Sequence, residues 1–167
     1  MSSKNGKAMI AVELGNQNIR VAGLDGLGMP KIITNKDKED FNPNCLFYEN
    51  GKFVLGRATM SERLLRSQDV ITNFKPKIGT DKVVFERDGK KFCMRDLYGE
   101  VFRSIKECGE RVGGQVIGDM VVTVPEQWGT KKRRDVEKSA KIAGLNVKKY
   151  LRTDGFVLRQ RHVSIGN

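Results

Sequence analysis

The run at residues 119–124, Asp-Met-Val-Val-Thr-Val, limits the possible folds of this chain more than any other segment. It is apolar nearly throughout, rich in β-branched side chains, and followed by Pro125. This pattern is typical of a central strand buried on both faces, because other elements must then cover both sides of the sheet. We therefore expect a sheet with packed helices, in which this strand lies at the centre.

The N-terminal part is predicted to be an antiparallel β-meander. Residues 9–14, 18–24 and 30–34 show alternation and β-branched content that favour strands. The breaks between them, Gly-Asn-Gln at 15–17 and Asp-Gly-Leu-Gly at 25–28, contain residues that tolerate the backbone angles of tight turns.

Residues 37–115 are predicted to form an inserted second unit. An Asn-Gly pair and an Asp-Gly pair mark two hairpins in it. The clearest helix in the chain follows, because two glycines end a pattern in which apolar residues recur at helical spacing on one face. These residues are Leu97, Val101, Ile105, Cys108 and Val112. The predicted elements are strands at 44–48 and 52–55, a short helix at 59–66, strands at 83–86 and 91–94, and a helix at 95–112.

The C-terminal part is predicted to be strand, helix and strand. Thr130 is the expected cap of a helix at 130–143, Gly144 ends it, and a strand follows at 146–151. The whole order of elements predicts an α/β protein in which helices cover a mixed sheet.

The bulk properties argue against several classes of protein. The first apolar run, residues 8–12, is cut off by Glu13 and is too short for a signal peptide or a membrane span, so we expect a cytoplasmic protein. Three widely spaced cysteines, Cys45, Cys93 and Cys108, without a Cys-x-x-Cys pair indicate buried or semi-buried thiols and not a zinc site. A single histidine, His162, leaves little basis for a histidine triad or a multi-histidine metal site.

The net charge of +11 is unevenly distributed. Residues 131–161 contain eleven Lys and Arg but only three acidic residues. Such a stretch can attract phosphate-bearing partners, including nucleic acid, or can be a solvated helix face. We favour the solvated face, because aromatic residues are not regularly interleaved with the charges as stacking platforms.

Glu13 and the turn after it are the first candidates for chemistry. The carboxylate lies at the end of a predicted strand, next to a glycine turn whose N–H groups can point outward together. A concave set of amides can hold phosphate, and a nearby carboxylate can hold a metal ion directly or through water.

Several segments in order resemble the ATPase domain of the seventy-kilodalton heat-shock chaperones, the DnaK-like family. Residues 11–18, Ala-Val-Glu-Leu-Gly-Asn-Gln-Asn, resemble its first phosphate loop, Gly-Ile-Asp-Leu-Gly-Thr-Thr-Asn-Ser. Residues 74–79, Phe-Lys-Pro-Lys-Ile-Gly, are similar to its Lys-Arg-x-Ile-Gly segment. Residues 121–125 and 140–147 look like its Val-Pro strand and its Ile-Ala-Gly-Leu signature, so the similarity runs from about residue 9 to 151.

The resemblance implies one lobe of an actin-like ATPase, a ribonuclease H-like fold with a mixed sheet and flanking helices. Residues 9–36 and 116–151 would form the first subdomain, 37–115 an inserted small α+β subdomain, and 152–167 a divergent tail. In this family ATP lies between two lobes and is bound through two phosphate loops, an adenosine pocket and Mg²⁺. We therefore expect a truncated module whose partners are nucleotide and a complementary lobe or co-chaperone.

The resemblance also assigns roles to single residues. Glu13 falls where the family has an aspartate that holds the water shell of the magnesium ion. Gly15, Asn16 and Gln17 fall on the loop that contacts the phosphates. Lys75 falls on the lysine that helps to position the attacking water. Phosphoryl transfer depends on positioning and charge neutralisation, which these residue types can supply.

Departures from the family pattern affect the same site. Glu13 is one methylene longer than aspartate, and a displacement near 1 Å can cost roughly a hundredfold in rate. Asn16 and Gln17 replace two threonines, Pro76 replaces an arginine, and Thr153 stands where the family has a glutamate.

Two functions are nearly balanced on sequence alone. The first is a chaperone-related ATP-binding module that is unable to hydrolyse ATP by itself. The second is a non-catalytic interaction or scaffold lobe that has lost nucleotide turnover. Nucleic-acid binding through residues 131–161 is a third, less favoured hypothesis.

Overall fold

The computed structural model describes residues 7–56, 65–72 and 75–152. The predicted helix at 59–66 lies almost entirely outside these residues. Thr153, which replaces a glutamate of the family pattern, and His162, the single histidine, also lie outside them.

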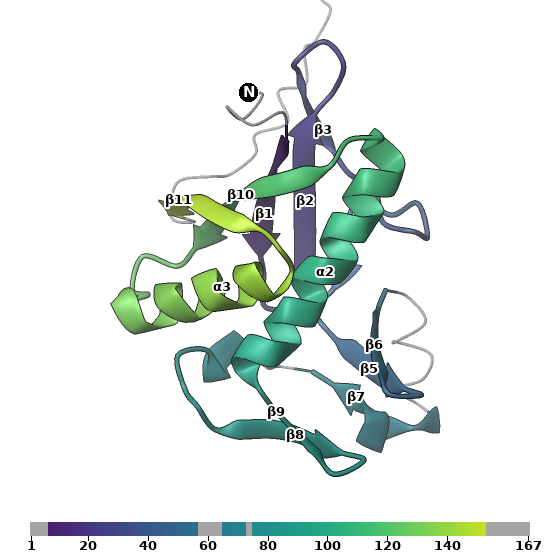
Figure 1. Cartoon of the computed structure of the whole chain (residues 1–167), viewed down its shortest axis with the longest axis vertical. Coiled ribbons are helices and arrows are strands. Elements are labelled where there is room, and N and C mark those ends of the chain that lie inside the picture. Colours follow the sequence, from purple (N-terminus) through teal and green to yellow (C-terminus); the bar gives the residue numbers. More distant parts are fainter. Residues whose placement is uncertain (1–6, 57–64, 73–74, 153–167) are drawn as a thin grey trace, which may run out of the picture.

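A mixed sheet forms the upper part of the molecule (Figure 1). Its strand order is β11-β10-β1-β2-β3. The strands are β1 (Ala8–Leu14), β2 (Asn18–Leu24), β3 (Pro30–Ile32), β10 (Ile117–Val124) and β11 (Asn146–Arg152). The first three are antiparallel, which confirms the predicted meander, whereas β10 is parallel to both β1 and β11.

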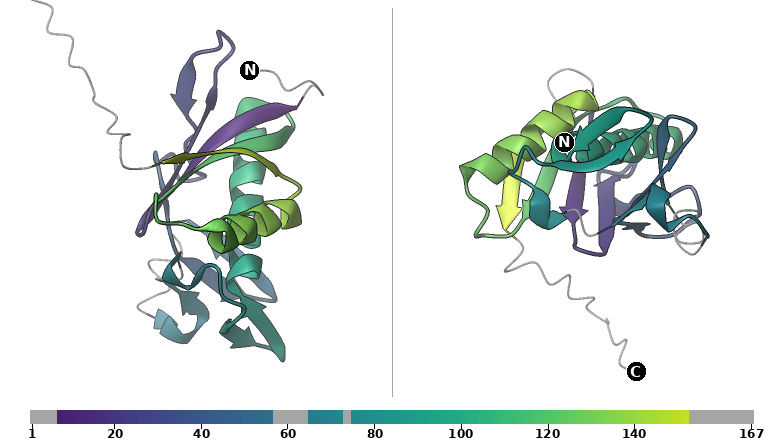
Figure 2. Two further views of the ribbon diagram at one scale, coloured as in Figure 1. Left: turned by 90° about the vertical axis from the view of Figure 1, so that its left-hand side faces the viewer. Right: turned by 90° about the horizontal axis from the view of Figure 1, so that it is seen from below.

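Two smaller sheets lie near the start of helix α2 (Figure 2). One contains β5 (Leu46–Glu49), β6 (Lys52–Leu55) and β7 (Val70–Ile71), and the other is the hairpin of β8 (Val83–Arg87) and β9 (Lys90–Cys93). Both hairpins predicted from the Asn-Gly and Asp-Gly pairs are therefore present.

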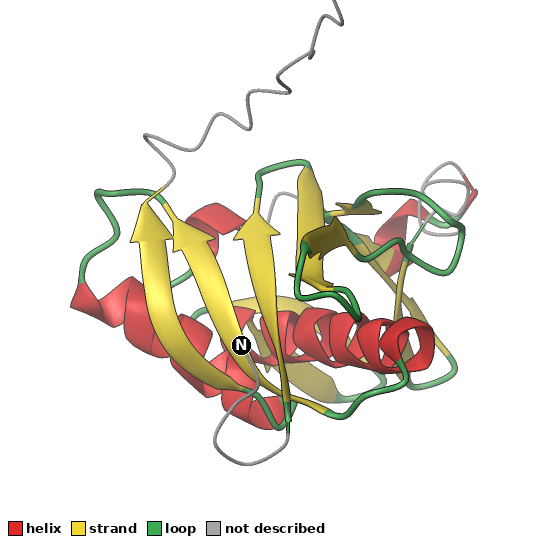
Figure 3. Cartoon of the chain, turned by 90° about the horizontal axis from the view of Figure 1, so that it is seen from above, coloured by secondary structure: helices red, strands yellow, loops and turns green. Residues whose placement is uncertain are grey.

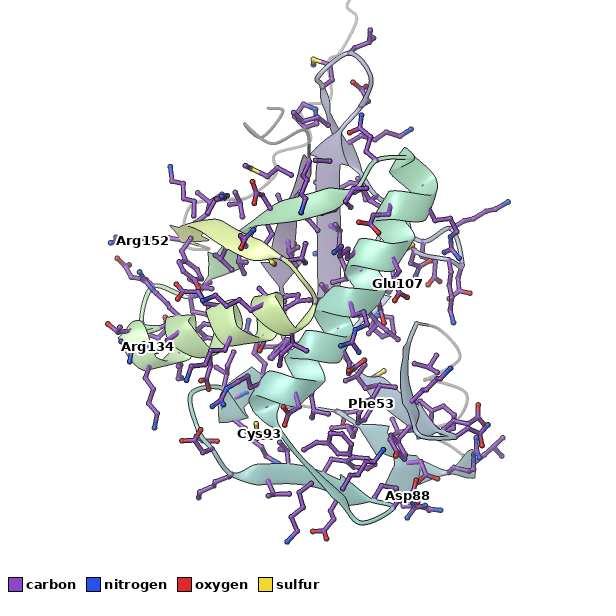
Figure 4. All side chains as sticks on the ribbon, viewed as in Figure 1. Phe53, Asp88, Cys93, Glu107, Arg134 and Arg152 are labelled. Atoms are coloured by element: carbon purple, nitrogen blue, oxygen red, sulfur yellow. The ribbon has the colours of Figure 1, made fainter. Side chains whose placement is uncertain are left out.

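An aromatic cluster joins the two small sheets. Tyr48 and Phe53 come from the first sheet, and Phe85 and Phe92 from the second. The Phe53 and Phe92 rings meet edge to face with centroids 4.9 Å apart, and Tyr48 lies 5.4 Å from Phe85. Figure 4 shows Phe53 within this cluster. Two short sheets bury too little surface to be stable alone, so these rings stabilise the pair.

Helices α2 (Met94–Gly113) and α3 (Thr130–Ile142) pack on the same side of the main sheet (Figure 3). The two helices approach closely at Gly99, where a Cβ atom would lie 2.8 Å from Cγ2 of Ile142. Leu97, Val101 and Ile105 of α2 are buried, as their spacing predicts, and Cys108 is half-buried. The prediction is wrong for Val112, which is 57% exposed because it lies in the last turn of the helix. The helix ends at Gly114, which adopts a φ of 65°.

Strand β10 is central in the sheet, but only one of its faces is fully buried. Met120, Val122 and Val124 are inaccessible to solvent, whereas Val121 and Thr123 are half-buried. The expectation of burial on both faces is wrong for the described residues, because both helices lie on one side.

Three local features differ from the prediction. Gly129 occupies the N-cap of α3 with no side-chain hydrogen bond, so Thr130 is the first helical residue and not the cap. The pair Asn42–Pro43 forms β4 beside β2, and β7 pairs with β5. Strands of two residues carry no readable alternation, so only the folded chain shows them.

Within the described parts of the chain, no helix has the length and apolar character that a membrane span requires.

Replacing Leu97 with Ala should lower the free energy of unfolding by about 2–5 kcal/mol, because the side chain is fully buried and its removal leaves a cavity. Val112 lies on the same helix but is 57% exposed, so Val112→Ala should change stability by no more than about 0.5 kcal/mol. Urea denaturation with linear extrapolation measures both. Equal losses in the two variants would contradict the assigned helix face.

Candidate functional site

The turn between β1 and β2 lies at the edge where two parallel strands end. Strands β1 and β10 run in the same direction with Glu13 beside Thr123, so Gly15 and Pro125 both follow strand ends at this edge. Ligands of open α/β sheets are commonly bound outside the carboxyl ends of the strands. The edge next to Gly15 is therefore the expected position of a ligand site.

An open cleft of about 570 Å³ occupies this edge. It is lined by Glu13, Leu14, Gly15, Asn16, Lys75, Pro76, Pro125, Gln127, Trp128 and Lys132. Four of the five residues predicted from the sequence line this cleft together. The fifth, Gln17, is exposed and is not among the lining residues.

Lys75 is the most buried charged side chain in the cleft, at 8% exposure. Its ammonium group donates a hydrogen bond to the carbonyl oxygen of Leu14 and lies 5.5 Å from the centroid of the Trp128 ring. Burial lowers the pKa of Lys75, and the nearby Glu13 carboxylate partly opposes this effect. The lysine is thus fixed beside the glycine turn, 61 residues away in the sequence.

Asn44 orients the turn, and sequence reasoning did not identify it. Its buried side-chain amide donates to the carbonyl oxygens of Gly15, at 2.9 Å, and Asn16, at 3.4 Å. Its own backbone N–H donates to the carbonyl oxygen of Gln17, at 2.6 Å. In a trans peptide the N–H points away from the preceding carbonyl, so the N–H groups of Asn16 and Gln17 face away from Asn44.

The turn itself needs glycine at its first position. A Cβ atom at Gly15 would collide with the carbonyl oxygen of Asn18. Glycine therefore permits the tight return of the chain that brings successive carbonyl groups to Asn44. In the sequence, Asn44 is recognisable only as a polar residue at the start of a predicted strand. Its contact with the turn cannot be predicted from a local pattern, because the two segments are far apart in the sequence.

Glu13 is half-exposed and forms an ion pair with Arg20, its neighbour across the β1–β2 hairpin, at 3.3 Å. An exposed pair of this kind contributes about 0–1 kcal/mol, so it leaves the carboxylate able to change partner. No group of three or more metal-binding side chains occurs among the described residues. Glu13 thus fits Mg²⁺ that arrives with phosphates and water, because Mg²⁺ commonly takes only one or two protein carboxylates.

The segment that carries Lys75 is docked on helix α3. The N–H of Gly79 donates to the buried carboxylate of Asp135 at 2.9 Å, and Arg95 lies 3.6 Å from the same carboxylate. Gly79 has a φ of 83°, which favours glycine. Asp135 thereby connects the Lys75 segment with both helices and fixes the wall of the cleft.

Trp128 and Lys132 complete this wall and were not predicted as site residues. Trp128 is 5% exposed, and the Lys132 ammonium lies 5.8 Å from its ring centroid. The sequence placed Lys132 within a general basic stretch. Its role in the cleft depends on how α3 packs, which its charge does not reveal.

Lys75→Met should shift the pH dependence of stability in a defined direction. Because burial lowers the pKa of Lys75 below its ordinary value of 10.5, the unfolded chain binds more protons than the folded chain between the folded-state pKa and 10.5. As the pH rises through this interval, the free energy of unfolding of the wild type should therefore increase relative to that of the variant. At pH values below the interval Lys75 is charged in both states, so the cost of burying the charge is fully present.

Denaturation at pH 7.5 and pH 10 measures this change, with Lys77→Met, an exposed lysine of the same turn, as the matched control. A difference between wild type and Lys75→Met that stays constant, or that moves in favour of the variant, would contradict the assigned burial of the charge.

The geometry agrees with a comparison to known protein families. The sequence model of the Hsp70 protein family matches residues 9–152 of the 167-residue chain. Its members share the actin-like ATPase fold, bind ATP or ADP with Mg²⁺, and work with co-chaperones, so the predicted fold class is confirmed. The chain belongs to the Hsp70 protein family and carries an ATP-binding, chaperone-related module.

Proposed function

We propose that the cleft binds the phosphate chain of ATP or ADP, with Glu13 facing the water shell of the accompanying Mg²⁺. The contact between the Lys75 ammonium and the Leu14 carbonyl supports this proposal most directly. It places a buried cation beside the glycine turn, which is the combination that a phosphate group requires.

The turn would contribute backbone donors. Asn44 accounts for three carbonyl groups of the turn, at Gly15, Asn16 and Gln17. Among the described residues, no side chain or backbone oxygen accepts a hydrogen bond from the N–H groups of Asn16 and Gln17. These donors are oriented before a ligand arrives, so binding does not need to reorganise them.

Lys75 would neutralise charge and help to position the attacking water near the terminal phosphate. Mg²⁺ would supply further charge neutralisation on the phosphate oxygens. We expect this chain alone to hydrolyse ATP slowly or not at all. The longer Glu13 side chain displaces the carboxylate relative to an aspartate, and amides at Asn16 and Gln17 replace hydroxyl groups.

A non-catalytic scaffold is the second candidate function. Two observations favour it: Gln17 lies outside the cleft lining, and Glu13 is engaged with Arg20. In this reading the lobe would bind a complementary lobe or a co-chaperone without nucleotide turnover.

Nucleic-acid binding is the least supported candidate. Arg134 on α3 and Arg152 at the end of β11 extend outward (Figure 4), but the described basic stretch has only one aromatic residue, Tyr150. Its hydroxyl donates to the carbonyl oxygen of Arg133 at 2.7 Å and its ring is half-buried, so it does not offer a free stacking surface.

Saturating magnesium ATP should raise the melting temperature of the full chain. At about 100 times Kd a ligand adds ~2.7 kcal/mol of stability, which corresponds to a shift of roughly 5–10 °C for a protein of this size. Differential scanning fluorimetry measures it. Lys75→Met should lose most of the shift and Lys77→Met should keep it. Absence of any shift for wild type at millimolar nucleotide would favour the scaffold.

Glu13→Gln should reduce the preference of the protein for ATP with Mg²⁺ over ATP in EDTA. The variant loses one charge-assisted hydrogen bond of about 1.5 kcal/mol to the metal-bound water. The ratio of the affinity for ATP with Mg²⁺ to the affinity for ATP in EDTA should therefore fall about tenfold. Calorimetric titration with and without Mg²⁺ measures it. Arg20→Gln removes only the ion-pair partner of Glu13, so it should retain the preference. An unchanged ratio in Glu13→Gln would exclude Glu13 from the magnesium shell.

A further inference from the structure

We infer that Lys132 is a second phosphate-binding lysine of the cleft, which acts with Lys75 to select ligands that carry at least two phosphate groups. This inference rests on the proposed function, because it concerns the same cleft. It assigns a binding role to a residue that the sequence placed only within a general basic stretch.

Two lysines from different elements converge on one aromatic ring. Lys75 begins the short 3-10 helix Lys75–Lys77, and Lys132 lies in the first turn of α3. Their ammonium groups lie 5.5 and 5.8 Å from the centroid of Trp128, and all three residues line the cleft. A tryptophan face attracts cations, so the ring holds both groups at the cleft.

The stem of Lys132 is fixed by packing. A Cβ atom at Gly79 would lie 2.9 Å from Cγ of Lys132 and 3.5 Å from its Cα, so the backbone of Gly79 contacts this stem directly. The Gly79 N–H is bound in turn to Asp135 of the same helix. Because the stem is already constrained, Lys132 loses less rotamer entropy on binding an anion than a free surface lysine would.

The charges of the cleft are unbalanced without an anion. The lining contains two ammonium groups but one carboxylate, Glu13, which is paired with Arg20. Lys132 has no ion-pair partner among the described residues, and the first turn of α3 contains no acidic residue. The two ammonium groups lie 5.5 and 5.8 Å from the Trp128 centroid and repel each other, and a bound anion would offset this repulsion.

The pairing defines the class of ligand. A lysine ammonium acts as a point charge toward phosphate, so two separate lysines can engage two phosphate groups of one chain. Diphosphate and triphosphate ligands can satisfy both Lys75 and Lys132, whereas a monophosphate can satisfy them less completely.

Calorimetric titration of the full chain with inorganic tripolyphosphate, magnesium ATP and AMP tests this role. Lys132→Met keeps the aliphatic stem against Gly79 and removes the charge. This variant should bind tripolyphosphate and magnesium ATP about tenfold more weakly, which corresponds to ~1.4 kcal/mol. Its affinity for AMP should fall by less than about threefold. Lys131→Met is the matched control, because Lys131 is exposed on the same helical turn and does not line the cleft. It should bind every ligand as wild type does.

Lys132→Arg, which keeps the positive charge, should retain most of the affinity, and thermal unfolding establishes that each variant is folded. Binding of magnesium ATP by wild type and by Lys132→Met with equal affinity would overturn this inference and leave the proposed function standing. An equal loss in Lys131→Met would also overturn it, because the effect would then be a general one of net charge. Absence of binding of both magnesium ATP and tripolyphosphate to wild type would overturn the proposed function and this inference together.

Discussion

The buried ammonium group of Lys75 is the constraint on which the cleft depends. A charge at 8% exposure needs a partner, and the Leu14 carbonyl supplies it at the end of β1. The segment that carries the lysine is held to α3 through Gly79 and Asp135. One side chain thus connects the main sheet with a segment 61 residues later, and both edges of the cleft are set by this connection.

The positive charges that line the cleft lower the stability of the folded protein. Desolvation lowers the pKa of Lys75, which means that burial disfavours the charged form. Lys132 adds a second positive charge near the same tryptophan. Charged groups placed this way are unfavourable for the empty fold but suited to an anionic ligand, because their orientation is already determined when the ligand arrives. The buried faces of β1 and β10 beside the cleft supply the stability that tolerates this arrangement.

Most of the secondary structure followed from local patterns. The hairpins were marked by Asn-Gly and Asp-Gly pairs, α2 by the spacing of Leu97, Val101 and Ile105, and the end of α3 by Gly144. Failures occurred where a local pattern is ambiguous. Thr130 has good capping chemistry, yet Gly129 takes the N-cap, and the apolar run of β10 looks the same whether one or two faces are covered.

The sequence by itself determined most of the elements, their order, the family, and four of the ten residues that line the cleft. Tertiary structure alone decided that Gln17 stays outside the cleft, that Asn44 turns the carbonyl groups of the loop to one side, and that Trp128 and Lys132 complete the wall. The physical reason is distance along the chain. Periodicity and turn chemistry act over a few residues. The contacts of Asn44 with the turn and of Lys75 with Leu14 join residues 28 to 61 positions apart, and their geometry exists only once helix and sheet have packed.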